Sequence, residues 1–149
     1  MTQPEVARIF DLALWLAGAG HFVILFASAQ VPSRLRWKQD LAQLMPFNRK
    51  LLWVQGGFTV LTIIAFGALT LALHEELLRG DRASIGLACF IATYWTARIL
   101  VDAFYFSSED WPKGKQFVIG HILLTSLFVV LACSYWALFV WHVWLRTGR

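Results

Sequence analysis

Four long apolar runs determine what this chain can fold into. They cover residues 10–29, 51–73, 83–106 and 117–145. Each is about 18 residues long or longer, which is the length that an α-helix needs to cross the hydrocarbon core of a bilayer. The whole chain is 58% hydrophobic and 15% charged, and this composition places it outside the class of soluble domains.

We therefore predict an all-α integral membrane protein, an antiparallel four-helix bundle that forms one transmembrane domain over residues 1–149. The connection at 75–82 is short, polar and contains glycine, so the helices on either side of it should be antiparallel neighbours. The predicted helices run approximately over residues 10–30, 47–74, 83–107 and 112–146.

The first apolar run differs from a cleaved secretory signal. Its small residues at 17–20 resemble a cleavage region, but the preceding residues 1–8 are barely basic and the apolar run continues to Ala29. A cleaved signal has a basic leader and ends soon after its small residues. We expect an uncleaved helix.

The first connection is the longest, and prolines at positions 32 and 46 bracket it. Its apolar side chains recur at helical spacing among charged residues, a pattern that predicts a short amphipathic helix lying on the membrane surface. These apolar residues are Trp37, Leu41, Leu44 and Met45.

Basic residues in the connections predict the orientation of the chain. The first and third connections together hold seven Lys or Arg: Arg34, Arg36, Lys38, Arg49, Lys50, Lys113 and Lys115. The opposite side holds five: Arg8, Arg79, Arg82, Arg146 and Arg149. Positive residues favour the cytoplasmic side. We therefore expect the 31–50 and 107–116 connections in the cytoplasm and both termini outside.

The net charge of +4 does not indicate a nucleic-acid partner, because the basic residues lie beside apolar runs, where they meet anionic lipid headgroups. The lipid bilayer is the predicted partner, together with other membrane subunits or further copies of the chain. Cys89 and Cys133 have no metal-binding or redox spacing and are interpreted as packing residues.

The third apolar run carries ionisable side chains where they are most costly. Tyr94, Arg98, Asp102 and Tyr105 follow a spacing that places them on one face of a helix. A charged side chain facing lipid costs roughly 3 kcal/mol on insertion scales. We expect this face to turn into the protein and to form part of a binding site.

Each predicted helix also contributes one polar side chain at a similar depth. His21, Gln55, Arg98 and His121 all lie about nine residues from the side of the first and third connections, or roughly 13 Å deep. A shared depth predicts one common polar site.

Haem is the first cofactor that this site suggests. His21 and His121 each follow a glycine, and histidine is a common axial haem ligand. Arg98 would then hold a propionate, and Tyr94, Trp95 and Phe128 would line the plane. His74 and His142 form a second, weaker candidate pair of iron ligands near the other face.

Quinone is the alternative ligand. Hydrogen-bond donors suited to carbonyl oxygens come from His21, Gln55, Arg98 and Tyr105. Asp102 and His121 would relay protons. Either cofactor predicts a haem- or quinone-associated electron-transfer or accessory subunit.

Three further interpretations remain open. The polar residues can join helices in a non-catalytic structural or assembly subunit, because interhelical hydrogen bonds stabilise membrane proteins by roughly 0.6 kcal/mol each. The chain can also be a small proton-coupled or anion transporter that acts as an oligomer. Soluble-enzyme motifs such as a glycine-rich phosphate loop or HExxH are missing from the sequence. The third open interpretation is a membrane enzyme that modifies lipids.

Overall fold

The computed structural model describes residues 3–106 and 114–147, and this part of the chain is helical apart from short turns. Four of its helices are long and apolar enough to cross a membrane, as the sequence predicts. They are α1 (Gln3–Ser28), α4 (Pro46–Ala72), α6 (Arg82–Phe104) and α7 (Lys115–Thr147).

The first connection is broken where the sequence predicts one amphipathic helix. It contains α2 (Val31–Arg34), α3 (Trp37–Asp40) and the 3-10 turn η1 (Leu41–Gln43). Arg36 lies between α2 and α3 with φ 51°, in the left-handed region, so the chain changes direction there. The ring of Trp37 packs against Trp53 of α4 with centroids 6.1 Å apart.

The helix ends also differ from prediction in places. The first helix starts at Gln3, ahead of the predicted residue 10, because its boundary does not depend on where the apolar run begins. A short helix, α5 (His74–Arg79), occupies most of the predicted second connection, and Gly80 ends it with φ 72°. The predicted start of the last helix at Pro112 lies outside the described residues.

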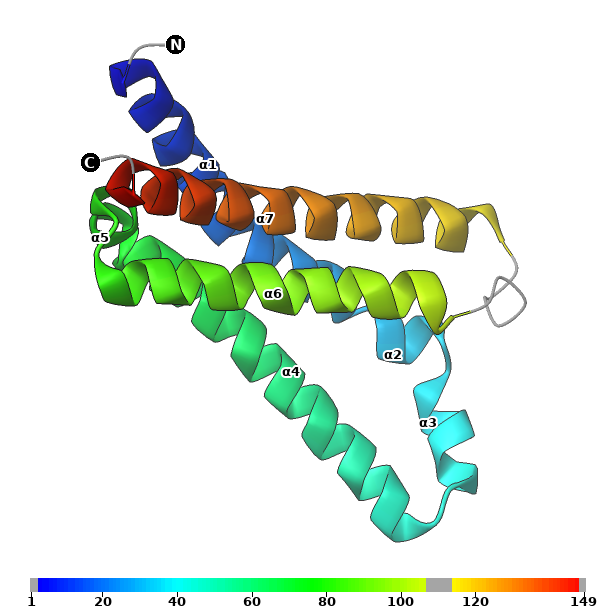
Figure 1. Ribbon diagram of the computed structural model, residues 1–149. Helices are drawn as coiled ribbons and strands as arrows, with labels where there is room; N and C mark the ends of the chain where they lie inside the picture. The colour runs from blue at the N-terminus through cyan, green and yellow to red at the C-terminus, as the bar shows by residue number, and fades with distance from the viewer. Residues whose placement is uncertain (1–2, 107–113, 148–149) are drawn as a thin grey trace.

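The long helices form two closely packed pairs. α6 and α7 run antiparallel side by side, while α1 crosses α4 (Figure 1). Glycines allow that crossing: a Cβ on Gly67 would lie 2.8 Å from the Phe22 ring, and one on Gly18 would lie 2.5 Å from Leu71. α5 and the two ends of the chain lie at the same end of the molecule.

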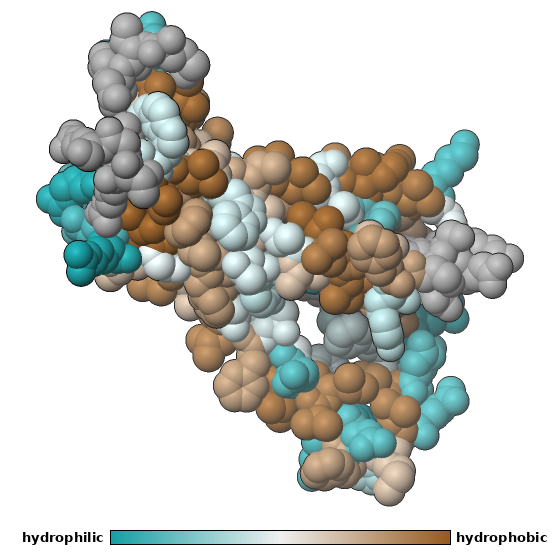
Figure 2. Space-filling view, in the orientation of Figure 1, coloured by the Kyte–Doolittle hydropathy of each residue, from teal (hydrophilic) through white to brown (hydrophobic). Residues whose placement is uncertain are grey.

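α4 diverges from α6 along its first half. Its buried residues are confined to the second half, namely Ile63, Phe66, Gly67 and Thr70. Phe66 contacts α6 through the ring of Tyr94, with centroids 5.1 Å apart. Figure 2 shows the molecule hollowed between the first half of α4 and the remaining helices. We call this space, between the first half of α4 and the second half of α6, the notch.

Hydropathy divides the surface along the long helices. In Figure 2, hydrophobic side chains cover the middle of the molecule, and hydrophilic ones gather toward its two ends. Many large apolar side chains of the long helices are exposed, such as Phe26 at 78% and Leu123 at 66%. Exposed apolar surface on this scale is expected where a protein faces lipid or packs against another protein.

Candidate functional site

The centre of the molecule holds a polar cluster with one residue from each long helix. Its members are His21, Thr70, Trp95 and Tyr135, each at most 1% exposed. The indole Nε1 of Trp95 donates to Nε2 of His21 over 3.1 Å. The hydroxyl of Tyr135 lies 2.6 Å from Oγ1 of Thr70. We call these four residues the central cluster.

The central cluster satisfies its own hydrogen bonds. His21 Nδ1 donates to the carbonyl oxygen of Ala17 over 2.7 Å, so its other nitrogen is free to accept from Trp95. Thr70 donates to the carbonyl of Phe66, which leaves Tyr135 as the donor to Thr70. Every polar side-chain group of the cluster therefore has a partner, as a buried polar network requires.

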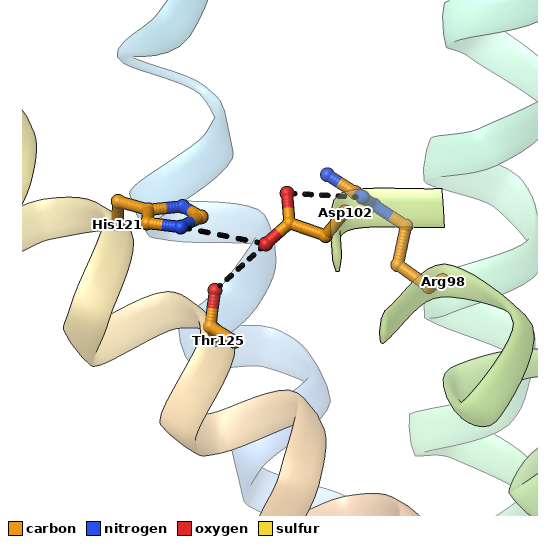
Figure 3. A network of polar contacts seen from close by, with 4 residues as sticks. All are labelled: Arg98, Asp102, His121 and Thr125. Carbon is orange, nitrogen blue, oxygen red and sulfur yellow. Dashed lines mark hydrogen bonds and ion pairs between the residues drawn. The ribbon is translucent and has the colours of Figure 1, made fainter. Parts of the chain in front are cut away.

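A second network surrounds Asp102 between α6 and α7. The Asp102 side chain is 7% exposed. One carboxylate oxygen lies 3.6 Å from Arg98 Nη1, and the other lies 3.5 Å from His121 Nε2 and accepts from Thr125 over 3.1 Å. Figure 3 shows the carboxylate between His121 on one side and Arg98 on the other. We call these four residues the Asp102 network.

Arg98 is held by more than its neighbouring carboxylate. Its guanidinium carbon lies 5.4 Å from the centroid of the Phe128 ring, within the range of a cation–π contact. Its Nη1 is buried and, within the described residues, makes no hydrogen bond, since Asp102 is 3.6 Å away. The side chain is 38% exposed. The Nη1 nitrogen is therefore an unsatisfied polar group inside the described part of the protein.

His121 lies at the opposite edge of the Asp102 network. Together with Thr125 and Ser126 it lines a shallow, mainly apolar groove on the surface of α7. The side chain of His121 is 32% exposed. The Asp102 network therefore connects the groove on α7 with the α6 surface that carries Arg98.

Helical spacing places a polar face on each wall of the notch. Phe66 of α4 meets Tyr94 of α6, so residues one to three turns away from each share the same side. On α4 these are Thr62, Thr59 and the exposed Gln55. On α6 they are Arg98, Asp102 and Tyr105, of which Asp102 contacts α7 and Tyr105 is 79% exposed.

The structure divides the predicted common layer among separate places. Arg98, Asp102 and His121 do converge. His21 belongs instead to the central cluster, bonded to Trp95. Gln55 is exposed on the diverging half of α4, because that helix leaves α6 before the predicted depth is reached.

The second histidine pair makes separate contacts near α5. His74 Nε2 lies 2.7 Å from Asp11 Oδ1, and His142 Nε2 donates to the carbonyl of Leu77 over 3.1 Å. Within the described part of the chain, no group of three His, Cys, Asp or Glu side chains is placed to hold a metal ion. These histidines join α5 to α1 and α7.

Two members of the central cluster were not among the predicted site residues. Thr70 and Tyr135 are hydroxyl-bearing residues in the middle of apolar runs. The ring of Tyr135 lies 6.0 Å from the ring of His21, and its hydroxyl bonds to Thr70. A search for hydroxyls at mid-helix positions would have marked both residues. Their pairing across 65 positions depends on how the helices pack and has no local signature.

Over residues 3–106 and 114–147, the protein is helical apart from short turns, has four apolar helices of membrane-spanning length, and contains the central cluster and the Asp102 network. Comparison with known proteins adds no relative, because no family model, no curated sequence and no solved structure matches the chain.

Proposed function

We propose that this protein is an integral membrane four-helix bundle that binds a quinone in the notch and serves as a quinone-associated accessory or electron-transfer subunit. The four apolar helices span the bilayer. The connections at 31–50 and 107–116 face the cytoplasm, since they hold more Lys and Arg than the opposite side.

The Asp102 network is the observation that carries the proposal. A carboxylate that is 7% exposed inside a membrane span is costly and marks a functional site by default. It is flanked by Arg98 toward one surface and by His121 toward another. A network that only joined α6 to α7 would not need two partly exposed ionisable groups at its edges.

The notch supplies groups that suit a quinone head group. Gln55, Arg98 and Tyr105 offer N–H and O–H donors to carbonyl oxygens, and Tyr94 offers an aromatic ring. The apolar side chains around them suit an isoprenoid tail. Lipid-soluble ligands can enter sideways from the bilayer, because the notch is open along the first half of α4.

The protein's own residues account for proton movement at this site. His121 Nε2 and Asp102 Oδ2 lie 3.5 Å apart, a distance that a small rotation of either side chain closes to a hydrogen bond. Thr125 fixes the same carboxylate oxygen, and Arg98 compensates its charge. His121 can thus exchange a proton with Asp102 beneath a ligand in the notch.

The geometry favours quinone over haem as the ligand. His21 and His121 belong to different networks, and both ring nitrogens of His21 are engaged by Ala17 and Trp95. The purified protein separates the two cofactors by its absorption spectrum. A haem band that is lost in His21→Ala or His121→Ala would replace quinone with haem in this proposal.

Photolabelling tests the quinone site. An azidoquinone should label the walls of the notch in nanodiscs, and excess decylubiquinone should compete. Gln55→Leu removes an exposed donor and should weaken competition roughly three- to tenfold, the worth of one hydrogen bond. Gln116→Leu is the matched control, an exposed glutamine at the start of α7.

Two results would overturn the quinone proposal. One is labelling that excess quinone does not reduce. The other is competition that is the same in the parent protein, Gln55→Leu and Asp102→Asn.

A non-catalytic assembly subunit is the second candidate, and the central cluster favours it. All four of its side chains are buried and bonded to one another or to backbone carbonyls. Such a network stabilises the helix packing without needing a ligand. In that case, Asp102→Asn would change the stability of the protein and leave the function of the assembled complex intact.

A further inference from the structure

Residues 31–50 lie at the wide end of the notch and have the same net charge as the whole protein. Residues 31–50 contain five Lys or Arg and one acid, Asp40, for a net charge of +4. The complete chain also has a net charge of +4, so the charges of all other residues cancel. The segment runs from the end of α1 to the start of α4, across the wide end of the notch (Figure 1).

This segment packs against α4. Trp37 of α3 packs edge-on against Trp53 of α4, with an interplanar angle of 70°. Four of its five cations, Arg34, Arg36, Lys38 and Lys50, are exposed. Arg34 donates to the side chain of Gln30 over 3.1 Å. Within the described residues, Arg34, Arg36 and Lys38 form no ion pair with a carboxylate.

Exposed apolar side chains follow these three cations along the chain, at the start of α4. Met45 is 70% exposed, Phe47 is 72% exposed and Leu51 is 53% exposed. A segment with exposed cations that leads into a helix start with exposed apolar residues matches a molecule with a negative head and hydrocarbon chains. A soluble anion would use the cations alone and gain nothing from Met45 or Phe47.

We propose that an anionic phospholipid binds at this corner, with its phosphate among Arg34, Arg36 and Lys38 and its acyl chains along the first turns of α4. Charge complementarity identifies the occupant, because an anionic headgroup is attracted to clustered Lys and Arg at the membrane surface. The site lies in one leaflet only. This inference goes beyond the quinone proposal and does not depend on it.

Spin-label EPR in nanodiscs tests the inference. The full chain is reconstituted in phosphatidylcholine with spin-labelled phosphatidylglycerol or spin-labelled phosphatidylcholine, and the motionally restricted fraction gives the preference for the anionic lipid. The test variant carries Arg34→Gln, Arg36→Gln and Lys38→Gln. The matched control carries Arg8→Gln, Arg79→Gln and Arg82→Gln, which remove the same charge at the opposite end.

We expect the parent protein and the control to prefer phosphatidylglycerol. The test variant should lose at least about threefold of this preference, given an upper limit of about fivefold per charge removed. Adding 10 mM inorganic phosphate should leave the preference unchanged. Circular dichroism of both variants checks that the helices remain formed.

Three results would overturn the inference. The first is a parent protein without lipid preference, and the second is an equal loss in both variants, which would indicate nonspecific surface attraction. The third is displacement of the lipid by inorganic phosphate, which would indicate a soluble anion. A test variant that loses its helical signal is replaced by the three single variants, which face the same criteria.

Discussion

Replacing Trp95 with phenylalanine tests how the central cluster holds the four helices together. Trp95 is 1% exposed, donates its Nε1–H to His21 Nε2 over 3.1 Å and stacks on Phe128 with ring centroids 4.8 Å apart. Phenylalanine retains an aromatic ring for the stacking contact but has no N–H. The variant would therefore leave a buried acceptor on His21 without a donor.

The expected loss follows from these contacts. An unpaired buried acceptor costs about 1–3 kcal/mol. The smaller ring leaves a gap whose lost packing costs about 1 kcal/mol more. Hydrogen bonds between helices in a bilayer average only about 0.6 kcal/mol, because the unfolded helices find other partners. We therefore expect Trp95→Phe to lower the free energy of unfolding by about 2 kcal/mol.

A second tryptophan provides a matched control. Trp136 on α7 also makes one indole hydrogen bond between α6 and α7, to Thr96 Oγ1 over 3.0 Å. It is only partly buried, and Thr96 keeps its own bond to the carbonyl of Ala92. Trp136→Phe should therefore cost less than about 1 kcal/mol.

Equilibrium unfolding in mixed detergent and SDS micelles measures both losses. The measurement follows helix content and tryptophan fluorescence, and a common transition for both signals justifies a two-state analysis. Equal losses in Trp95→Phe and Trp136→Phe would refute the reasoning, because burial and the orphaned His21 acceptor would then have no energetic effect.

Two further predictions use the same unfolding assay. Gly67→Ala should destabilise the protein by about 1–3 kcal/mol, because the added Cβ would lie 2.8 Å from Phe22. Gly56 has open space around it, so Gly56→Ala should be neutral or stabilising. Equal effects of the two substitutions would contradict the close α1–α4 crossing. Asp102→Asn should cost about 1–2 kcal/mol by leaving Arg98 without its carboxylate, a cost reduced by the partial exposure of Arg98. Adding Arg98→Gln should recover part of that loss, and strictly additive losses would show that the two side chains do not interact.

The positions of the long helices could be predicted from sequence because they depend on local composition. A run of apolar residues about 20 long has one way to satisfy its backbone in an apolar solvent, which is to form a helix. The left-handed Arg36 that breaks the first connection had no comparable signal, since arginine has no preference for that conformation. The short helix α5 was missed because six residues are too few to show a clear periodicity.

The structure brings together only some of the residues of the predicted common site. Spacing along one helix correctly placed Arg98 beside Asp102, and depth counting brought His121 to the same level. Depth counting failed for Gln55. It assumes that the helix axes are aligned, whereas the axis of α4 diverges from that of α6. Tyr135 and Thr70 meet over 65 positions, and helical spacing does not extend across a connection.

The sequence by itself determined that four apolar helices form and which side chains share a face on each, because both properties follow from neighbours within a few turns of the same helix. Only the tertiary structure decided which faces meet. The α1–α4 crossing at Gly18 and Gly67 brings the second half of α4 into the centre and carries its first half away. Crossing angles depend on side-chain shapes from two distant segments at once, so this choice separates His21 from Gln55 and opens the notch.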